Sequence, residues 1–326
     1  MTTSQAADLA AELLAYIEAA TPNGPEPAVK PDHRVKFSWP PHPISYSYHI
    51  HASDWSGHTS VEMHGESFDV RIAKTPFGVF GRCQALWLEA KGQTEEQMLK
   101  LLAKLAEPFF QRQLSIGKCL GIARRFTGSI RELQPIDLLK LLYCPDRDVA
   151  SEAQTELDTH ASSHLFTPAL IAILRDDRHP QRRSAQWCVL DLFEDLPAFA
   201  KTTQEESEAL EAMRALIWNA IDDYARTAFK AGVVLGGHLP HMRGGKMLFS
   251  CLAAPSKYGR RSAIHGLFHT VEWVPDLRDE VVAALQNSAA TDPDPELREF
   301  AAGLVHDIEQ GSYDHIPEPV FAEEAA

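Results

Sequence analysis

Three side chains that could bind a metal ion stand close together in the sequence. His265, His269 and Glu272 occupy positions i, i+4 and i+7 of one stretch. In a helix this spacing places all three on one face, and imidazole and carboxylate groups are ligands that zinc accepts. The neighbouring Phe268 and Trp273 equally fit a half-buried helix whose histidines are hydrogen-bonded within the protein. The sequence therefore leaves open a metal-dependent enzyme centred on these residues and a structural helix without a metal.

A second group of histidines lies nearer the N-terminus. His49 and His51 stand two residues apart, so a strand would place both on one face, where two imidazoles can chelate a metal. Asp54, His58 and His64 follow closely. Histidines on a solvated strand face are the alternative, and the spacing does not decide between the two.

Two arginine doublets, Arg182-Arg183 and Arg260-Arg261, recur at equivalent positions in the C-terminal part. One arginine of each doublet is expected to form ion pairs within the protein, which leaves the other for a partner's carboxylate. Arginine and tryptophan dominate the energetic centres of protein interfaces. The predicted partner-binding residues are Arg182, Arg260, Trp187, Trp218 and Trp273. Burial in the core is the alternative for the tryptophans.

Other kinds of chemistry have no signature in the sequence. We recognise no Ser-His-Asp arrangement, no H-E-x-x-H motif and no nucleotide-binding glycine motif, so we predict no catalytic residue and no cofactor. Glycines at 232, 236, 237, 244 and 245 are interpreted as helix ends and a tight turn. The five cysteines are scattered singly, so disulfides and zinc ribbons are not indicated, and small buried hydrophobic side chains are expected.

The formal net charge of −14 is unevenly distributed. All of the acidic excess lies in residues 131–326, which carry 18 Lys and Arg against 32 Asp and Glu. Surfaces that bind phosphates are basic, so nucleic acid and anionic membranes are not expected partners. No stretch approaches the roughly 20 apolar residues of a membrane helix, and the acidic Asp8 and Glu12 do not fit a secretory signal. We expect a cytoplasmic protein whose partner carries a basic surface patch.

The N-terminal part predicts a short helix, a linker and a strand-rich segment. Residues 3–20 place Leu9, Leu13 and Ile17 on one helical face, and this helix either packs on the body or stays loose. Residues 21–33 are proline-rich and are interpreted as a linker. Alternating apolar residues then predict an antiparallel meander, with strands over 44–51, around Val61 and Met63, and over 68–72.

A helix is expected to follow these strands and to cover one face of the sheet. Thr94 and Gln97 form a capping pair at its start, and Met98, Leu101, Leu102 and Leu105 are expected to form its buried stripe. The packed part of this domain is expected to end near residue 112. A further connecting helix is predicted over 114–126.

From about residue 133 onward the sequence repeats. Aligned segments containing a basic or small residue, one intervening residue and then Ala or Phe begin at Ser151, Arg183, Arg226, Arg261 and Arg298. Their separations of 32 to 43 residues fit two helices and two turns per unit. A break rich in Asp or Pro precedes each segment. We expect Asp or Pro to start the second helix of each unit, and Arg to reach an Asp of the neighbouring unit as a ladder.

This D-x-x-x-x-R-x-A style of unit resembles the HEAT superfamily, especially the short bacterial HEAT-like repeats of the phycobilisome-lyase type, over residues 133–310. The resemblance implies an armadillo-like α-solenoid with an extended curved surface for binding a protein. It also implies an alternative function as a phycobiliprotein chromophore lyase. HEAT-like di-iron hydroxylases carry His-Glu dipeptides in their repeats, and this chain contains none. That class of enzyme is therefore not expected.

Together these patterns predict a mainly α protein in which an α-solenoid of HEAT-like repeats follows a small α+β domain. The expected divisions are an N-terminal helix (1–20), a linker (21–33), the α+β domain with its connecting helix (34–130), the repeat array (131–310) and a C-terminal tail (311–326). The favoured function is a non-catalytic scaffold that binds another protein through the acidic array. A chromophore lyase and a metal-dependent enzyme using His265, His269 and Glu272 remain the alternatives.

Overall fold

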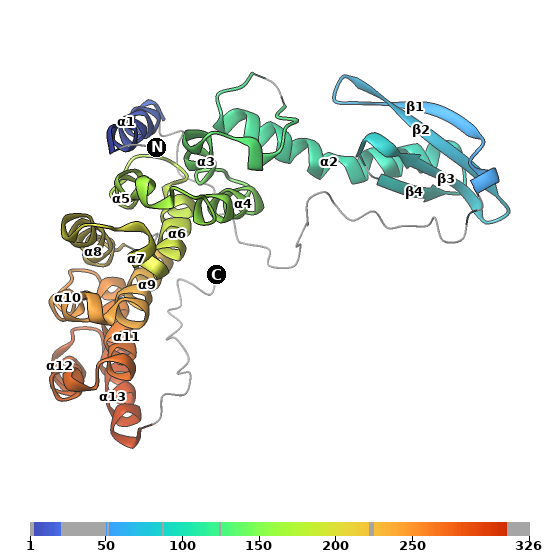
Figure 1. Ribbon diagram of the computed structural model, residues 1–326. Coiled ribbons are helices and arrows are strands. Elements are labelled where there is room, and N and C mark those ends of the chain that lie inside the picture. Colours follow the sequence, from blue (N-terminus) through green and yellow to red (C-terminus); the bar gives the residue numbers. More distant parts are fainter. Residues whose placement is uncertain are drawn as a thin grey trace. The chain divides into compact units, whose positions relative to one another are not determined.

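The computed structural model describes residues 3–20, 50, 52–86, 88–123, 125–221 and 225–311. These residues form two compact units. The sheet unit comprises the described residues of Pro27–Glu132 and Cys144–Val149, and the helical unit those of Met1–Glu26, Leu133–Tyr143 and Ala150–Ala326. The described part of the protein is mainly helical, and its strands lie in the sheet unit (Figure 1). Within these ranges no helix is both long and apolar enough to cross a membrane.

The sheet unit is built on a four-stranded antiparallel sheet in the order β1-β2-β3-β4. Its strands are β1 (Gly57–Met63), β2 (Glu66–Thr75), β3 (Gly78–Cys83) and β4 (Leu88–Gly92). In β2 the side chains of Val70 and Ile72 are buried and that of Arg71 between them is exposed, so the alternation predicted for this strand is confirmed. Of the predicted strand over 44–51 only Ile50 is described, and His49 and His51 lie outside the described residues.

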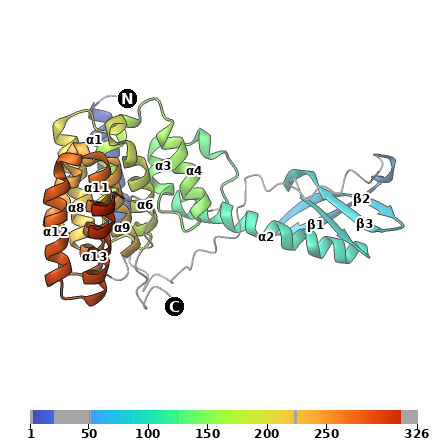
Figure 2. The ribbon, with the colours of Figure 1, turned by 90° about the horizontal axis from the view of Figure 1, so that it is seen from below.

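One face of the sheet is covered by α2 (Glu95–Cys119), as Figure 2 shows. The predicted start of this helix is confirmed, because the side chain of Thr94 accepts a hydrogen bond of 3.2 Å from the backbone N–H of Gln97. Four buried side chains of α2 pack in one cluster with the strands. They are Met98, Leu102, Ala106 and Phe110. The helix approaches β3 so closely that a Cβ atom at Gly81 would lie 2.1 Å from the Met98 sulfur.

The separate connecting helix predicted over 114–126 is wrong. Residues 114–119 are the last turns of α2, which continues through Pro108, and the chain leaves the helix at Gly121 with a positive φ of 69°. A proline in a helix removes one backbone hydrogen bond, but it does not remove the apolar stripe. Phe110 and Ile116 beyond it are both buried, and their packing keeps the helix continuous.

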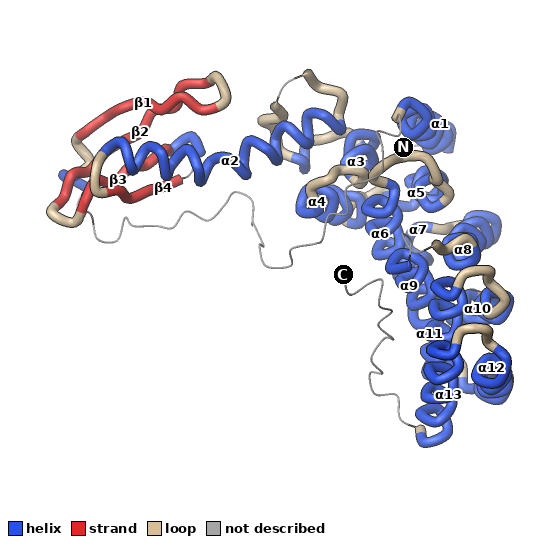
Figure 3. Tube along the Cα trace, turned by 180° about the vertical axis from the view of Figure 1, so that it is seen from behind, coloured by secondary structure: helices blue, strands red, loops and turns tan. Residues whose placement is uncertain are grey.

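The helical unit consists of helices packed in two layers (Figures 1 and 3). In the first layer α1 contacts α5, α5 contacts α8, and α8 contacts α10; in the second α6 contacts α9, α9 contacts α11, and α11 contacts α13. Hairpins such as α12 with α13 join the layers. The helices are α1 (Thr3–Ala19), α3 (Pro135–Leu141), α4 (Arg147–Asp158), α5 (Thr167–Leu174), α6 (Arg182–Leu192), α7 (Leu196–Phe199), α8 (Thr203–Trp218), α9 (Ala225–Val233), α10 (Gly244–Cys251), α11 (Lys257–Trp273), α12 (Arg278–Thr291) and α13 (Pro295–Gln310).

The turns that lead into the second layer use the residues expected from the sequence, but not always in the expected role. Asp294 caps α13 by accepting hydrogen bonds from the backbone N–H groups of Glu296 (2.9 Å) and Leu297 (3.4 Å), so the predicted start of this helix is confirmed. Asp176 instead closes a turn well before α6, whose first residue follows Gln181 without a side-chain cap. The break residues therefore shape the turns, and only some of them cap helices.

Two of the glycines predicted as helix ends, Gly232 and Gly236, allow close packing between two helices of the second layer. Gly232 lies in α9 and Gly236 in the π-helical turn that continues it (Val234–His238). A Cβ atom at Gly236 would lie 2.0 Å from the carbonyl oxygen of Gly266 in α11. Backbone meets backbone here, so no side chain can move aside. For Gly232, which lies inside α9, the helix-end interpretation is wrong because it considered the backbone of one helix and not the approach of a second; Gly244 begins α10 directly after Arg243, whose φ is 66°.

Helix α1 packs on the helical unit, which resolves the alternative left open by the sequence. Its Leu13 and Ile17 are buried, and Glu12 forms an ion pair of 3.2 Å with Lys140. Tyr16 contributes to an aromatic cluster in which its ring lies 5.9 Å from that of Tyr143. The α1 helix is therefore part of the packed body.

His179 belongs to the same aromatic cluster, and its ring lies 4.3 Å from that of Tyr143 and 5.5 Å from that of Tyr16. Burial lowers the pKa of His179 to about 4, against the opposing effect of nearby Asp176 and together with that of Arg182. Its Nδ1 atom accepts a hydrogen bond of 3.0 Å from the backbone N–H of Gln181. The imidazole is therefore neutral in the folded protein at neutral pH.

The substitution Gly236→Ala is expected to destabilise the protein by about 1–3 kcal/mol, because the added methyl group overlaps the backbone of α11. Gly303→Ala in α13 is the matched control. Its Cβ atom would meet nothing within 4 Å, so the better helix propensity of alanine should stabilise the protein by about 0.5–1 kcal/mol. Urea unfolding measures both free energies, and equal effects of the two substitutions would refute the close contact.

Acid is expected to destabilise the helical unit through His179. Between pH 6.5, the ordinary pKa, and pH 4 the unfolded chain binds a proton that the folded chain does not, so the free energy of unfolding falls as the pH is lowered. The loss is on the order of 3 kcal/mol. Urea unfolding across this range should show a reduced pH dependence in His179→Phe and an unchanged one in His306→Gln, whose residue is exposed. An unchanged slope in His179→Phe would contradict this assignment.

Candidate functional site

A partly exposed face of polar and aromatic side chains runs across the second layer of the helical unit. We call it the second-layer face. Its members are Trp187, Asp191, Glu194, Phe229, Lys230, His238, His265, His269 and Glu272. Contacts between these side chains join α6 to α9 and α9 to α11, and the stacking of His265 on Phe300 (6.3 Å) extends the series to α13.

Lys230 is the centre of the α6 end of this face. Its Nζ atom lies 2.7 Å from Asp191 Oδ1, forms a second ion pair with Glu194, and stands 5.8 Å from the centre of the Trp187 ring. Burial lowers the pKa of Lys230, but hydrogen bonds to the two carboxylates outweigh burial and raise it above its ordinary value. The ammonium group therefore stays charged and holds α9 against α6. His238 lies 3.9 Å from Glu194 at the edge of this cluster.

The α11 end of the face is a hydrogen-bonded row. Glu272 Oε2 lies 3.1 Å from His269 Nδ1, and His269 Nε2 lies 3.0 Å from His265 Nε2. The structure thus brings together the three residues that spacing placed on one helical face. One of the two imidazole nitrogens donates a hydrogen bond to the other, and the Glu272 carboxylate orients the pair. His265 also packs against Phe229, with ring centres 4.6 Å apart.

The metal interpretation of these three residues stays a prediction. Their contacts are hydrogen bonds to one another, in which His265 and His269 direct nitrogen atoms at each other. In the part of the chain that the structure describes, no group of three or more histidine, cysteine, aspartate or glutamate side chains is arranged to hold a metal ion. What the row offers chemically is a continuous chain of hydrogen bonds through two imidazoles and a carboxylate.

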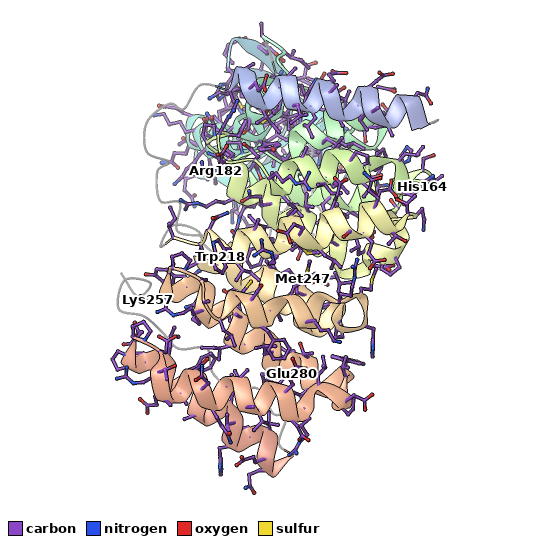
Figure 4. All side chains as sticks on the ribbon, turned by 90° about the vertical axis from the view of Figure 1, so that its left-hand side faces the viewer. His164, Arg182, Trp218, Met247, Lys257 and Glu280 are labelled. Carbon is purple, nitrogen blue, oxygen red and sulfur yellow. The ribbon has the colours of Figure 1, made fainter. Side chains whose placement is uncertain are left out.

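The three tryptophans predicted to bind a partner occupy different places. Trp187 belongs to the second-layer face, and Trp273 follows Glu272 with 57% of its surface exposed. Trp218 ends α8 in the first layer, under the guanidinium of Arg214 at 5.9 Å. Figure 4 shows Trp218, Arg182 and Lys257 toward one edge of the helical unit and His164 toward the other. The structure therefore does not gather the predicted set into one patch.

The arginines of the predicted set also differ. Arg182 is half-buried at the start of α6, where Nη1 donates a hydrogen bond of 3.0 Å to the carbonyl of His179. Arg260 is buried and is used within the protein, so it is a poor candidate for partner contacts. Its Nε and Nη2 atoms donate to the two carboxylate oxygens of Asp292 at 2.8 and 3.2 Å, while Nη1 donates to the carbonyls of Ala254 and Pro255.

The ladder was predicted for Arg261, the arginine of the aligned segment, with Arg260 left for a partner; instead it is Arg260 that pairs with Asp292, in the turn between α12 and α13. The other arginine of the doublet, Arg261, is fully buried. Its guanidinium carbon lies 5.4 Å from the centre of the Phe229 ring and 5.9 Å from that of the Tyr258 ring. Both arginines of the doublet are therefore structural. The expectation that one arginine of this pair faces a partner fails because neither side chain reaches the surface.

Sequence reasoning missed the lysine cluster of the second-layer face. Asp191 and Glu194 stand three residues apart, and Lys230 follows 36 residues after Glu194. A comparison of charged residues between the segments aligned at Arg183 and at Arg226 would have indicated the pairing.

Replacing Arg260 by methionine is expected to cost about 3–5 kcal/mol, because the carboxylate of Asp292 would stay buried without its counter-charge. The double variant Arg260→Met/Asp292→Leu should recover most of this loss. Arg175→Met is the control, since Arg175 forms an exposed pair of 3.5 Å with Glu208 and should change stability by less than about 1 kcal/mol. Urea unfolding compares the three variants, and similar losses for Arg260→Met and Arg175→Met would refute the role of the buried pair.

Comparisons with known proteins give this chain no family. No protein-family model matches it, and no curated protein shows significant sequence similarity. Among solved structures it is similar to an engineered protein from a structural genomics consortium, with 16% sequence identity and a TM-score of 0.33 over 66% of this chain and 94% of the other. At that score the likeness carries no argument about fold or function.

Proposed function

We propose that the helical unit is a HEAT-like α-solenoid and that its function is to bind another protein as a scaffold. The proposal is supported by helix pairs at repeat spacing, by two packed layers, and by the buried Arg260–Asp292 pair that joins neighbouring units. Stacked helical repeats form extended surfaces that suit large partners.

The observation that carries the proposal is the continuity of the second-layer face. Its side chains come from α6, α9 and α11, and their contacts link one helix to the next. Several are only partly covered, with 30% of Asp191, 29% of His269 and 31% of Glu272 exposed. A face that crosses several repeats can follow an extended segment of a partner, since each helix offers one set of contacts.

Charge indicates the kind of partner. Basic side chains of the helical unit are used in internal ion pairs, as Lys230 and Arg260 illustrate, while residues 131–326 carry 14 more acidic than basic residues. We therefore expect a partner with a basic surface, bound more weakly as salt rises. All five cysteines are buried thiols, which suits a reducing compartment, so we place the interaction in the cytoplasm.

The test is capture by the immobilised full chain from a lysate of the source cells at low salt, followed by quantitative mass spectrometry. Trp273→Ala and Glu272→Lys should weaken retention of the same protein by about tenfold, because an exposed aromatic and a carboxylate next to the face are lost. Glu280→Lys in α12 of the first layer (Figure 4) makes the same charge change away from this face and should bind like the wild type.

Equal loss in Glu280→Lys would show that net charge and not the second-layer face determines retention. A wild-type chain that retains no protein in excess of a denatured control would overturn the proposal.

A further inference from the structure

The row of His265, His269 and Glu272 on α11 has a geometry that the scaffold function does not use. The two histidines stand one helical turn apart, and their Nε2 atoms lie 3.0 Å from each other. Two imidazole nitrogens that face each other so closely can share a hydrogen bond, or they can bind one metal ion together. The arrangement of the rings and of the carboxylate bears on the second possibility.

The separation and tilt of the two rings suit a shared ion. Nitrogens that bind one tetrahedral zinc ion at about 2.0–2.1 Å stand about 3.3 Å apart, close to the distance between these Nε2 atoms. The ring centres of His265 and His269 are only 4.6 Å apart. A straight N–H···N bond would place the centres farther apart, because a full ring radius would be added at each end. The rings are therefore inclined, and an ion beside the line between the nitrogens is within reach of both.

The Glu272 carboxylate orients one of these two nitrogens. Its Oε2 atom lies 3.1 Å from Nδ1 of His269, the ring nitrogen that does not face His265. A carboxylate only accepts hydrogen bonds, so Nδ1 carries the hydrogen, and Nε2 of the neutral ring keeps its lone pair. Histidines that bind metal ions usually donate their other ring N–H in this way. Glu272 is thus a supporting residue and not a third ligand, in agreement with the absence of a three-ligand group among the described residues.

The surroundings hold one imidazole in place and leave the other within reach of solvent. His265 is buried, its ring centre lies 4.6 Å from that of Phe229, and it stacks on Phe300 at 6.3 Å. The side chains of His269 and Glu272 are partly exposed. An ion can therefore approach from the side of His269 without unfolding α11. The acidic excess of residues 131–326 also attracts cations to this part of the protein.

We propose that the Nε2 atoms of His265 and His269 together bind one divalent transition-metal ion, such as zinc, and that Glu272 orients His269 for this role. Imidazole is a ligand that zinc, copper and nickel accept. Binding replaces the hydrogen bond between the rings, and the hydrogen on Nε2 of His265 moves to Nδ1 of the same ring. Water fills the remaining positions around the ion, so the site is exchangeable, unlike a closed structural site with four protein ligands. The chain alone forms this site, which is therefore independent of the scaffold function.

The first experiment titrates the full chain with zinc chloride in a calorimeter, after purification without a histidine tag and treatment with a chelator. We expect a zinc ion to bind at a site that is lost in His265→Gln and in His269→Gln. His306→Gln in α13 removes an exposed histidine elsewhere in the helical unit and should bind zinc like the wild type. Zinc binding that is equal in the wild type and in His269→Gln would belong to other histidines and would overturn the proposal, as would a wild-type chain that binds no zinc.

Glu272→Gln separates the orienting role from direct coordination. The amide oxygen can still accept from Nδ1 of His269, but the negative charge is lost, so the zinc affinity should fall about tenfold. A loss as complete as in His269→Gln would make Glu272 a ligand and would contradict the arrangement with two nitrogens. Circular dichroism shows whether each variant folds. Should His265→Gln not fold, ¹⁵N NMR of the wild type decides, since zinc must shift the Nε2 signals of both histidines and unchanged signals would refute the site.

Discussion

The bidentate pair between Arg260 and Asp292 sets the geometry of the C-terminal helices. A guanidinium buried away from water must satisfy all its donors, and here the carboxylate and the carbonyls of Ala254 and Pro255 accept from it. The acid comes from the turn between α12 and α13 and the carbonyls from the turn between α10 and α11, so one side chain joins these two turns. The stacking of His265 on Phe300 likewise connects α11 to α13.

How much the sequence predicts depends on the range of the interaction that decides each feature. The alternation in β2, the cap of α2 at Thr94 and the shared face of His265, His269 and Glu272 follow from neighbours along the chain, and the structure confirms them. The continuation of α2 through Pro108 was missed because packing beyond the proline outweighs its local preference. Likewise the role of Gly236 is decided by the backbone of a helix 30 residues later.

The candidate sites likewise divide into those decided by neighbours along the chain and those decided by contacts between distant residues. Spacing within one helix indicates the histidine row, but the lysine cluster joins residues from α6 and the turn that follows it to a residue of α9. Arg260 was predicted to bind a partner because ion pairs within the protein were expected to need only one arginine of each doublet. Both arginines of this doublet are buried, so neither is left for a partner. A charged residue therefore indicates a partner-binding site only once the residue that pairs with it on a neighbouring helix or turn has been identified.

The packing of α1 on α3 and α5 has a consequence for how the protein is made. The first helix leaves the ribosome before its binding surface exists, because the whole sheet unit is inserted in the chain between them. At synthesis rates of about 5–20 residues per second, roughly 10–30 s pass before α5 has been made. During that interval Leu13 and Ile17 have no core to enter, so the nascent chain exposes these apolar side chains until α3 and α5 have been made.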